Sequence, residues 1–263
     1  MEHLIYLYGI IPESRDVAPF KGLDGEKDAY CLHLDGMKAV VCSLDEFEYN
    51  EEKLEEKVNN VEWLHEKAFH HHEALDKLNE EGPVIPMKFC TIYQSETSLR
   101  ATVEPKKQAF IHSLSRLDGK QEWNLKIYCD DEKWEEAFAH HNSIIEEKKA
   151  EIENLSPGKQ FFAKKKLDQW MKEEMDKEKD RLCYAIHDTL DDLAVESSVK
   201  KTWGKDVTGK NEAMNWNSVY LFSKEQVEEV AKHLESWKEK WGDRGWKFEV
   251  TGPWPPYHFA SLQ

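Results

Sequence analysis

Two tracts in the second half of the chain place apolar side chains at the spacing of an α-helix over a long distance. The first runs from about Glu132 to Leu155, the second runs from about Gln160 to Ala194, and the string SPGK separates them. The two apolar stripes consist of Trp134, Phe138, His141, Ile145, Ile152 and Leu155, and of Leu167, Met171, Met175, Leu182, Ile186 and Leu193. At about 1.5 Å per residue these helices reach on the order of 35 and 50 Å, which exceeds the width of a small domain. We therefore expect a helical hairpin with a kink in its second arm.

Segments typical of β-strands flank this hairpin. They are Trp123–Cys129, VESSVKKTWG, AMNWNSVYLF and WKFEVTG. The last two enclose a helix that we expect to begin at a capping box, Ser223 to Gln226, and to stop at Gly242. The order β-α-(α)-β-β-α-β is that of a ferredoxin-like sandwich with an enlarged first helix.

The first half of the chain predicts another α+β unit. The run Leu4 to Ile11 reads as a strand, and the next two, AYCLHLDG and MKAVVCSL, as a strand pair. A helical tract follows the N-cap Asn50 and extends to Gly82, either as one helix or with a separate short helix as its first part. Another helix covers about Glu96 to Leu117. Between them, GPVIPMKF predicts a strand in which Pro86 marks a sheet edge or a bulge.

The sequence thus predicts an α+β fold with two ferredoxin-like-related domains. We expect the first domain to cover residues 1–118. The second covers residues 119–252 and contains the long helices, and residues 253–263 form a tail rich in proline and aromatic side chains.

The charge of the chain restricts its partners. The formal net charge is −16 at pH 7, which disfavours binding to nucleic acid or to anionic lipid, since phosphate binding requires clustered lysine and arginine. The string KQFFAKKKLDQW, residues 159–170, is the one local reversal of this charge. It is either a solvated face that balances the acidic first arm of the hairpin or a docking point for an acidic partner.

Cysteine usage and the absence of targeting patterns indicate a cytosolic protein. The five cysteines form no C-x-x-C pair, and their odd number suggests reduced thiols. They are Cys31, Cys42, Cys90, Cys129 and Cys183. The apolar N-terminal run lacks the features of a signal peptide, and no segment approaches the roughly 18 apolar residues that a membrane span needs.

No pattern in the sequence supports catalysis, a metal site or a cofactor. His70, His71 and His72 lie together, but a zincin motif would need a histidine where Asp76 stands, so we interpret the cluster as a solvated helix face. The glycines form no phosphate-binding loop, and the carboxylate pairs are those expected by chance in a chain with 33% charged residues. We expect the cysteines to be buried small apolar side chains.

The closing string VTGPWPPYHFA contrasts with this charged chain. Pro253, Pro255 and Pro256 restrict φ and favour an extended, polyproline-like course. Trp254, Tyr257 and Phe259 add large apolar area with few rotatable bonds. The segment either folds back into the groove between the two domains or serves as a docking strip for a partner. The candidate protein-binding residues are Trp254, Pro255, Pro256, Tyr257 and Phe259.

Several strings together resemble one family. In chain order they are LIYLYGII, HHEALDKL with GPVIPMKFCTIYQSE, LDGKQEWNLKIYCD, SPGKQFFAKKK, SVYLFSKEQVEEV and VTGPWPPYHFA. From about residue 4 to residue 260 the chain is similar to the gas vesicle protein family GvpL/GvpF. The most specific strings are TGPWPPY, LDGKQEW and the P-x-x-F-x-T pattern from Pro86 to Thr91. Cys90 stands where the family usually has glycine; since cysteine favours an ordinary backbone conformation, we expect a slightly different turn there.

The resemblance implies a non-enzymatic accessory protein or minor component of gas vesicles, the gas-filled protein shells that give some prokaryotes buoyancy. Its expected partners are the small, very apolar shell protein and other gas vesicle accessory proteins, with nucleation and assembly as its role. Two alternatives stay open: a permanent minor constituent of the shell, and, more distantly, a small-molecule enzyme on a ferredoxin-like scaffold. The implied location is the cytoplasm, at the gas vesicle.

Overall fold

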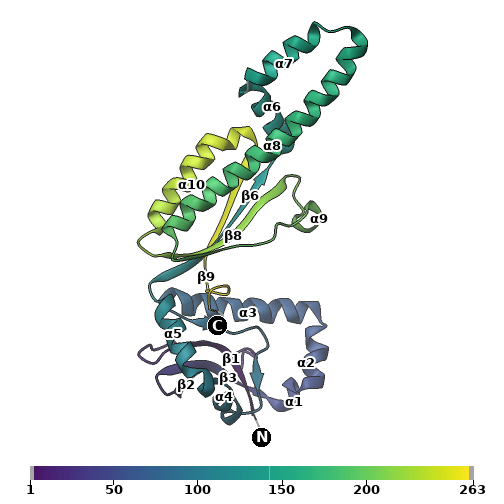
Figure 1. Cartoon of the computed structure of the whole chain (residues 1–263). Helices are drawn as coiled ribbons and strands as arrows, with labels where there is room; N and C mark the ends of the chain where they lie inside the picture. Colours follow the sequence, from purple (N-terminus) through teal and green to yellow (C-terminus); the bar gives the residue numbers. More distant parts are fainter. Residues whose placement is uncertain (1–2, 142, 261–263) are drawn as a thin grey trace. The chain divides into compact units, whose positions relative to one another are not determined.

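The computed structural model describes residues 3–141 and 143–260, which form two compact units (Figure 1). One unit comprises the chain up to Glu122 together with the closing segment from Pro253, and the other comprises Trp123–Gly252. Each unit combines helices with a β-sheet, so the α+β class is confirmed. The ferredoxin-like topology and the domain limits at residues 119 and 253 stay predictions.

The sheet of the first unit is built around β1 (His3–Pro12), whose residues from Leu4 to Ile11 are all buried. The order is β2-β3-β1-β4, with β2 at Tyr30–Leu34, β3 at Met37–Asp45 and β4 at Ile85–Pro86. The short strand β5 (Ile92–Tyr93) also pairs with β1, and each of these pairings is antiparallel. Pro86 therefore lies in an edge strand, as its missing N–H donor predicts.

Five α-helices accompany this sheet in the described part of the first unit. They are α1 (Glu46–Tyr49), α2 (Glu51–Val58), α3 (Val61–Glu81), α4 (Glu96–Val103) and α5 (Lys107–Leu117). The side chain of Asn50 caps α2 as predicted, and Asn60 caps α3 in the same way. The single helix expected from Glu96 to Leu117 is interrupted by the 3-10 turn η1 (Glu104–Lys106), because Pro105 lacks an N–H donor. Ala74, Leu75 and Leu78 of α3 complete the core against β1.

The turn at Cys90 corrects one expectation. Cys90 has φ = 63°, so it adopts the left-handed conformation that glycine accepts most easily. The backbone of this turn thus adopts a conformation that glycine would allow without strain, and cysteine is accommodated in it. Cys90 is also half-buried rather than buried.

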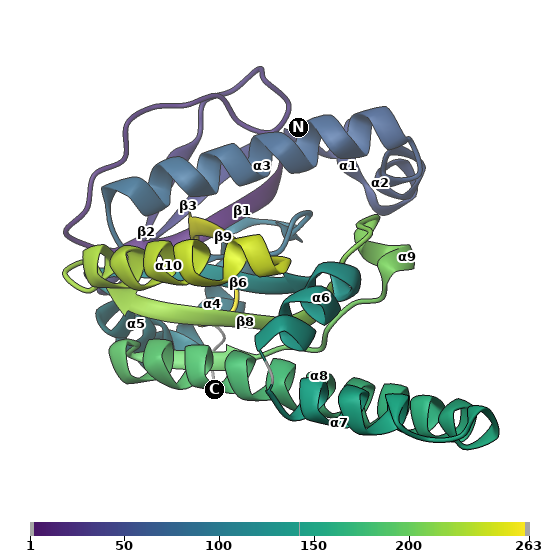
Figure 2. The same ribbon diagram turned by 90° about the horizontal axis from the view of Figure 1, so that it is seen from above.

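The sheet of the second unit has the order β7-β8-β6-β9. Its strands are β6 (Lys120–Cys129), β7 (Glu196–Val199), β8 (Ala213–Ser223) and β9 (Trp246–Trp254). A one-turn helix, α9 (Lys205–Thr208), lies in the loop between β7 and β8. Tyr220 and Phe222 of β8 point into a core with Leu125 and Ile127 of β6. Helices α8 (Pro157–Leu193) and α10 (Val227–Trp241) both pack on this core (Figure 2).

Helix α10 begins later than predicted. Its N-cap position is Gln226, no side chain caps it, and residues 224–226 form a turn, so the capping box expected from Ser223 is wrong. The helix ends at Trp241, where the predicted stop residue Gly242 opens the 3-10 turn η2 (Gly242–Arg244).

The helical hairpin is present. The first tract contains α6 (Asp131–His141) and α7 (Ser143–Glu153); residue 142 between them lies outside the described residues, as does the side chain of His141. The second tract is one continuous helix of 37 residues. The kink expected in it stays a prediction. The helix starts at Pro157 because proline suits the first turn of a helix.

The extended course expected for the closing segment is contradicted only at its end. Strand β9 continues through Pro253 to Trp254, and residues 257–260 form turns. The Ala260 N–H donates to the carbonyl of Pro256 at 2.8 Å, so the end of the segment is folded locally rather than extended.

Candidate functional site

The five candidate residues of the closing segment differ in their exposure. Pro255, Pro256 and Phe259 are buried, with Phe259 5% exposed. Trp254 is half-buried, and Tyr257 is 46% exposed. A partner therefore has access to Tyr257 and part of Trp254, while the other three side chains face the interior of the protein.

Charged groups of the first unit hold the backbone of this segment. The buried carboxylate of Glu122 accepts hydrogen bonds from the N–H groups of His258 at 2.9 Å and of Phe259 at 3.2 Å. The guanidinium of Arg116 donates to the carbonyl of Phe259. Charge-assisted bonds of this kind are stronger than neutral ones, so the segment is anchored at Phe259.

A histidine of α3 contacts the aromatic side chains of the segment. His72 Nδ1 lies 2.8 Å from the hydroxyl of Tyr257, and its ring centre lies 5.4 Å from that of Trp254. His72 Nε2 lies 3.2 Å from a carboxylate oxygen of Asp76. The interpretation of the histidine cluster as a solvated helix face is therefore wrong for His72, and it is also wrong for His71, which is buried. Nothing local in the sequence links residues 72 and 257.

The neighbouring histidine is buried. His71 is 4% exposed; its Nδ1 lies 2.7 Å from the hydroxyl of Tyr6, and its Nε2 lies 3.1 Å from the carbonyl oxygen of Met87. Burial lowers the pKa of His71 to about 4, so the imidazole is neutral at pH 7. Within residues 3–141 and 143–260, no group of three or more histidine, cysteine, aspartate or glutamate side chains is placed to hold a metal ion.

The cysteines lie in environments that do not activate a thiol. Cys42, Cys129 and Cys183 are buried, and Cys31 and Cys90 are half-buried. Burial raises the pKa of Cys90 to about 11 and those of Cys129 and Cys183 to about 12. Because the thiolate is the nucleophile, a raised pKa disfavours nucleophilic chemistry by these side chains at neutral pH.

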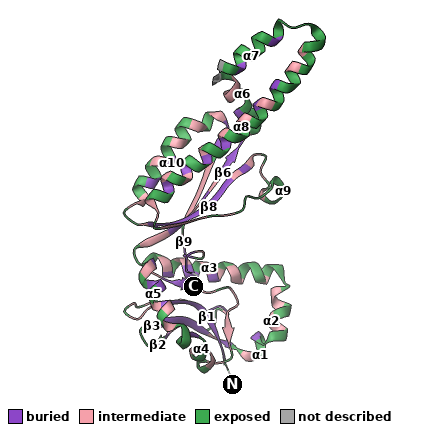
Figure 3. Ribbon diagram, viewed as in Figure 1, coloured by how far each residue is buried: buried purple, intermediate pink, exposed green. Residues whose placement is uncertain are grey.

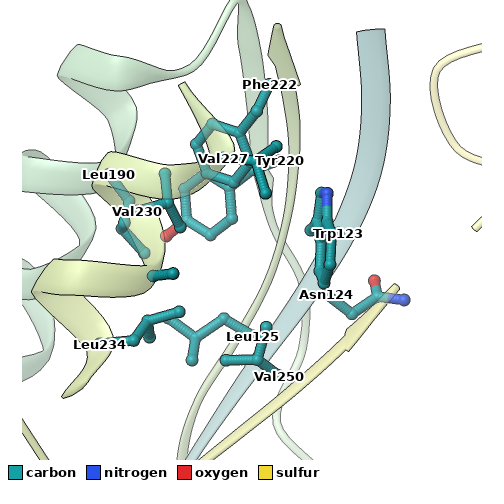
Figure 4. A pocket seen from close by; sticks show the side chains of 11 residues that line it. Trp123, Asn124, Leu125, Leu190, Tyr220, Phe222, Val227, Val230, Leu234 and Val250 are labelled. Carbon is teal, nitrogen blue, oxygen red and sulfur yellow. The ribbon is translucent and has the colours of Figure 1, made fainter. Parts of the chain in front are cut away.

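The second unit contains an apolar cavity that the sequence patterns did not indicate. It has a volume of about 60 Å³ and lies between the sheet and α10 (Figure 4). Its walls include Trp123, Leu125, Tyr220, Leu234 and Val250, and the amide of Asn124 points away from them (Figure 4). A single water needs roughly 10–15 Å³ and several polar partners, so this space suits a small alkyl group better than water. The lining comes from three strands and two helices, which explains why no local motif marks it.

The basic string lies at the start of α8. Phe161 and Phe162 are 67% and 68% exposed, and the lysines around them are exposed as well. Figure 3 shows this part of the second unit as mostly exposed surface. In the part of the chain that the structure describes, none of the helices is both long and apolar enough to cross a membrane.

Comparison with known proteins gives one consistent result. The family model "Gas vesicle synthesis protein GvpL/GvpF" matches residues 4–261. Gas vesicle protein L from Streptomyces sp. (strain CB03234) is 22% identical over 99% of this chain and 94% of its own length. Gas vesicle protein L1 from Halobacterium salinarum is 25% identical over 97% of this chain and 89% of its own length.

Solved structures show the same fold. The crystal structure of GvpF from Anabaena sp. PCC7120 is similar with a TM-score of 0.72 and 18% identity, and covers 99% of both chains. That of GvpF from Microcystis aeruginosa has a TM-score of 0.67 and 21% identity, and covers both chains completely. At these identities the likeness concerns the fold.

Proposed function

Because the chain belongs to the gas vesicle GvpL/GvpF family, we propose that it is an accessory protein that binds the apolar shell protein and assists gas vesicle nucleation and assembly. The observation that carries this proposal is the match of the family model to residues 4–261. The family is one of structural or assembly proteins rather than enzymes, and the proposed role involves no catalysis. The protein acts in the cytoplasm, at the growing vesicle.

The charge of the chain suits such a role. A very apolar subunit aggregates unless its apolar faces and strand edges are covered before it joins the shell. A bound partner with a net charge of −16 makes each complex repel the next one, which keeps the subunit in solution until it is transferred.

The apolar cavity of the second unit supports the proposal by offering a place for a side chain of the partner. Its walls include Leu125, Leu234 and Val250, and its volume of about 60 Å³ accepts a small alkyl group. Filling it adds van der Waals contacts with the apolar walls without burying an unpaired polar group.

Co-expression with the shell protein tests the proposal. The tagged chain is purified, the retained shell protein is quantified, and crosslinked peptides are identified by mass spectrometry. The matched variants are Leu234→Trp, which fills the cavity, and Val61→Ser, which changes an exposed apolar side chain of the first unit. We expect wild type and Val61→Ser to retain the shell protein equally and Leu234→Trp to retain less. A wild-type chain that retains no shell protein would refute the proposal.

A second measurement separates assembly from a permanent structural role. Intact vesicles are washed at high salt and probed for this chain with an antibody. For an assembly factor we expect most of the chain to be released by the wash. Retention in a constant ratio to the shell protein would favour a permanent minor constituent instead.

A further inference from the structure

The helical arm, residues 143–171, consists of α7 and the first part of α8 and has its own small core. Ile145, Ile152, Leu167 and Met171 form this core. None of them belongs to the core beneath the sheet of the second unit, and Phe138 packs against both cores. Figures 1 and 2 show the arm extending beyond that sheet. The apolar stripe of the arm is thus buried between its own two helices. An apolar side chain that stays exposed on the arm does not take part in this packing.

Phe161 and Phe162 are such side chains. They are 67% and 68% exposed, and their rings meet edge to face with centres 5.6 Å apart. Neither belongs to the core of the arm. Consecutive residues of a helix point about 100° apart, so an amphipathic stripe does not account for both. Two adjacent exposed aromatic side chains are typical of a surface that a partner covers.

Four lysines surround the pair. Lys159, Lys164, Lys165 and Lys166 are exposed, and residues 157–167 contain no acidic side chain. Within residues 3–141 and 143–260, none of these ammonium groups makes an ion pair or a hydrogen bond, although the acidic helix α7 lies beside them. Any charge balance between this string and the acidic arm of the hairpin therefore acts through solvent, and the solvated face stays an alternative. In a chain with a net charge of −16, four unpaired lysines suit an acidic occupant.

A groove runs between the two helices of the arm. Its volume is about 450 Å³, and Ile152, Leu155, Leu167 and Trp170 line it together with Lys148 and Lys166. The ammonium of Lys148 lies over the ring of Trp170, 5.5 Å from its centre. Volumes of roughly 300–1,000 Å³ are usual for binding sites. Glu151 also lines the groove, so its apolar walls carry two lysines and one carboxylate. The remaining positive charge fits a segment that presents apolar side chains beside carboxylates.

We propose that the tip of the helical arm, formed by Phe161, Phe162, the four lysines and the groove behind them, is a docking surface for the shell protein. The segment that docks carries carboxylates next to its apolar side chains. This inference rests on the proposed function, because it takes the occupant to be the shell protein. Beyond the proposed function, the inference specifies which surface of this chain contacts the shell protein and which charges meet there.

The test uses the full chain co-expressed with the shell protein. Phe161→Ser/Phe162→Ser removes the aromatic pair, and Lys164→Glu/Lys165→Glu/Lys166→Glu reverses three charges. The matched controls are Phe47→Ser, which changes a phenylalanine that is 80% exposed in the first unit, and Lys200→Glu/Lys201→Glu/Lys205→Glu, which makes the same change in net charge elsewhere. Thermal melting of each variant verifies that the fold is kept.

We expect both arm variants to retain at least tenfold less shell protein than wild type, because truncated aromatic anchors and reversed charges remove the strongest contacts. The two controls should retain as much as wild type. Retention by wild type should also fall when salt is raised from about 50 to about 500 mM. Equal retention by wild type and the aromatic double variant would overturn this inference alone. A wild type that retains nothing would overturn the proposed function together with it.

Two further outcomes would assign the surface to another occupant. Sedimentation of the isolated chain tests for a second copy, and co-sedimentation with vesicles of anionic phosphatidylglycerol tests for a bilayer. We expect a monomer and no vesicle binding, because a chain with a net charge of −16 repels both. A dimer or a vesicle complex that Phe161→Ser/Phe162→Ser abolishes would overturn the inference.

Discussion

His71 shows how one buried side chain makes the stability of the first unit depend on pH. Nε2 faces the carbonyl oxygen of Met87, which can only accept a hydrogen bond, so Nε2 carries the proton. Nδ1 then accepts from the hydroxyl of Tyr6. The neutral imidazole is thereby satisfied on both sides, and its burial lowers its pKa to about 4.

Acid should therefore weaken the folded state through His71. The ordinary pKa of 6.5 applies in the unfolded chain, so between pH 6.5 and about 4 the unfolded chain binds a proton that the folded chain does not. Stability is unaffected above this window and decreases by about 2–3 kcal/mol on going down to about pH 4.5. Urea unfolding of wild type and His71→Gln at several pH values between about 7.5 and 4.5 measures the difference. The substitution removes the titration, so the variant should lose less stability on acidification; equal pH slopes would contradict this.

Cys90 combines a left-handed backbone conformation, which favours glycine, with a side chain that is partly buried. Its φ of 63° costs a residue with a Cβ atom about 1–2 kcal/mol relative to glycine. We expect Cys90→Gly to be neutral or to stabilise the protein by up to about 1 kcal/mol, since some side-chain burial is lost. Cys90→Val should destabilise by about 1–2 kcal/mol because a β-branched residue tolerates this conformation least. Chemical denaturation of the three proteins tests the order, and a valine variant as stable as the glycine variant would show that the turn is not strained.

The thiol of Cys90 should react slowly despite its partial exposure. Burial raises its pKa to about 11, so only a very small fraction is thiolate near neutral pH. We expect alkylation of the native protein, followed by peptide mass spectrometry, to label Cys90 far more slowly than a free cysteine, with a rate that increases with pH. Rapid labelling near neutral pH would mean that the side chain lies in a more polar site.

At the scale of elements, the periodicity of apolar residues predicted the buried strands and helices. It did not predict helix ends or contacts between segments that are distant in the chain. The buried runs of β1 and β8 and the stripe of α10 repeat at the period of their own structure, so they could be identified directly. The capping signal at Ser223 failed because residues 224–226 form a turn before α10. The contact of His72 with Tyr257 and the apolar cavity join segments distant in the chain, which local patterns do not encode.

Alanine substitutions at two glycines should change stability in opposite directions, because one glycine is tightly packed and the other is not. A Cβ on Gly9 of β1 would lie 2.9 Å from the carbonyl oxygen of Ile85 and from Val84 Cγ2, whereas a Cβ on Gly158 of α8 would meet no atom within 4 Å. Gly9→Ala should destabilise the first unit by about 1–3 kcal/mol through overpacking. Gly158→Ala should stabilise α8 by up to about 1 kcal/mol through helix propensity. Thermal and urea unfolding test both; a Gly9→Ala variant as stable as wild type would mean that β1 and β4 can separate slightly.

At the scale of the whole molecule, the chain leaves its first unit and returns to it. The second unit, Trp123–Gly252, lies between Glu122 and the closing segment, which belongs to the first unit. Glu122 and Arg116, just before this departure, hold the backbone of His258 and Phe259 after the return. The stiffness of the prolines in the segment reduces the entropy lost on docking there. The first unit is therefore completed by residues that follow the second unit in the chain.

This arrangement predicts that the closing segment is chiefly structural. Phe259→Ala should cost about 3–5 kcal/mol, because the side chain is buried. Trp254→Ala/Tyr257→Ala should cost less, about 1–3 kcal/mol, since Tyr257 is partly exposed and its hydrogen bond to His72 is lost. Hydrogen exchange measured by mass spectrometry should show lost protection within residues 3–122 for both variants, while Trp123–Gly252 stays protected as in wild type. The opposite pattern, with unchanged protection and melting of Trp254→Ala/Tyr257→Ala but loss of the shell protein on co-purification, would make these two side chains a docking strip.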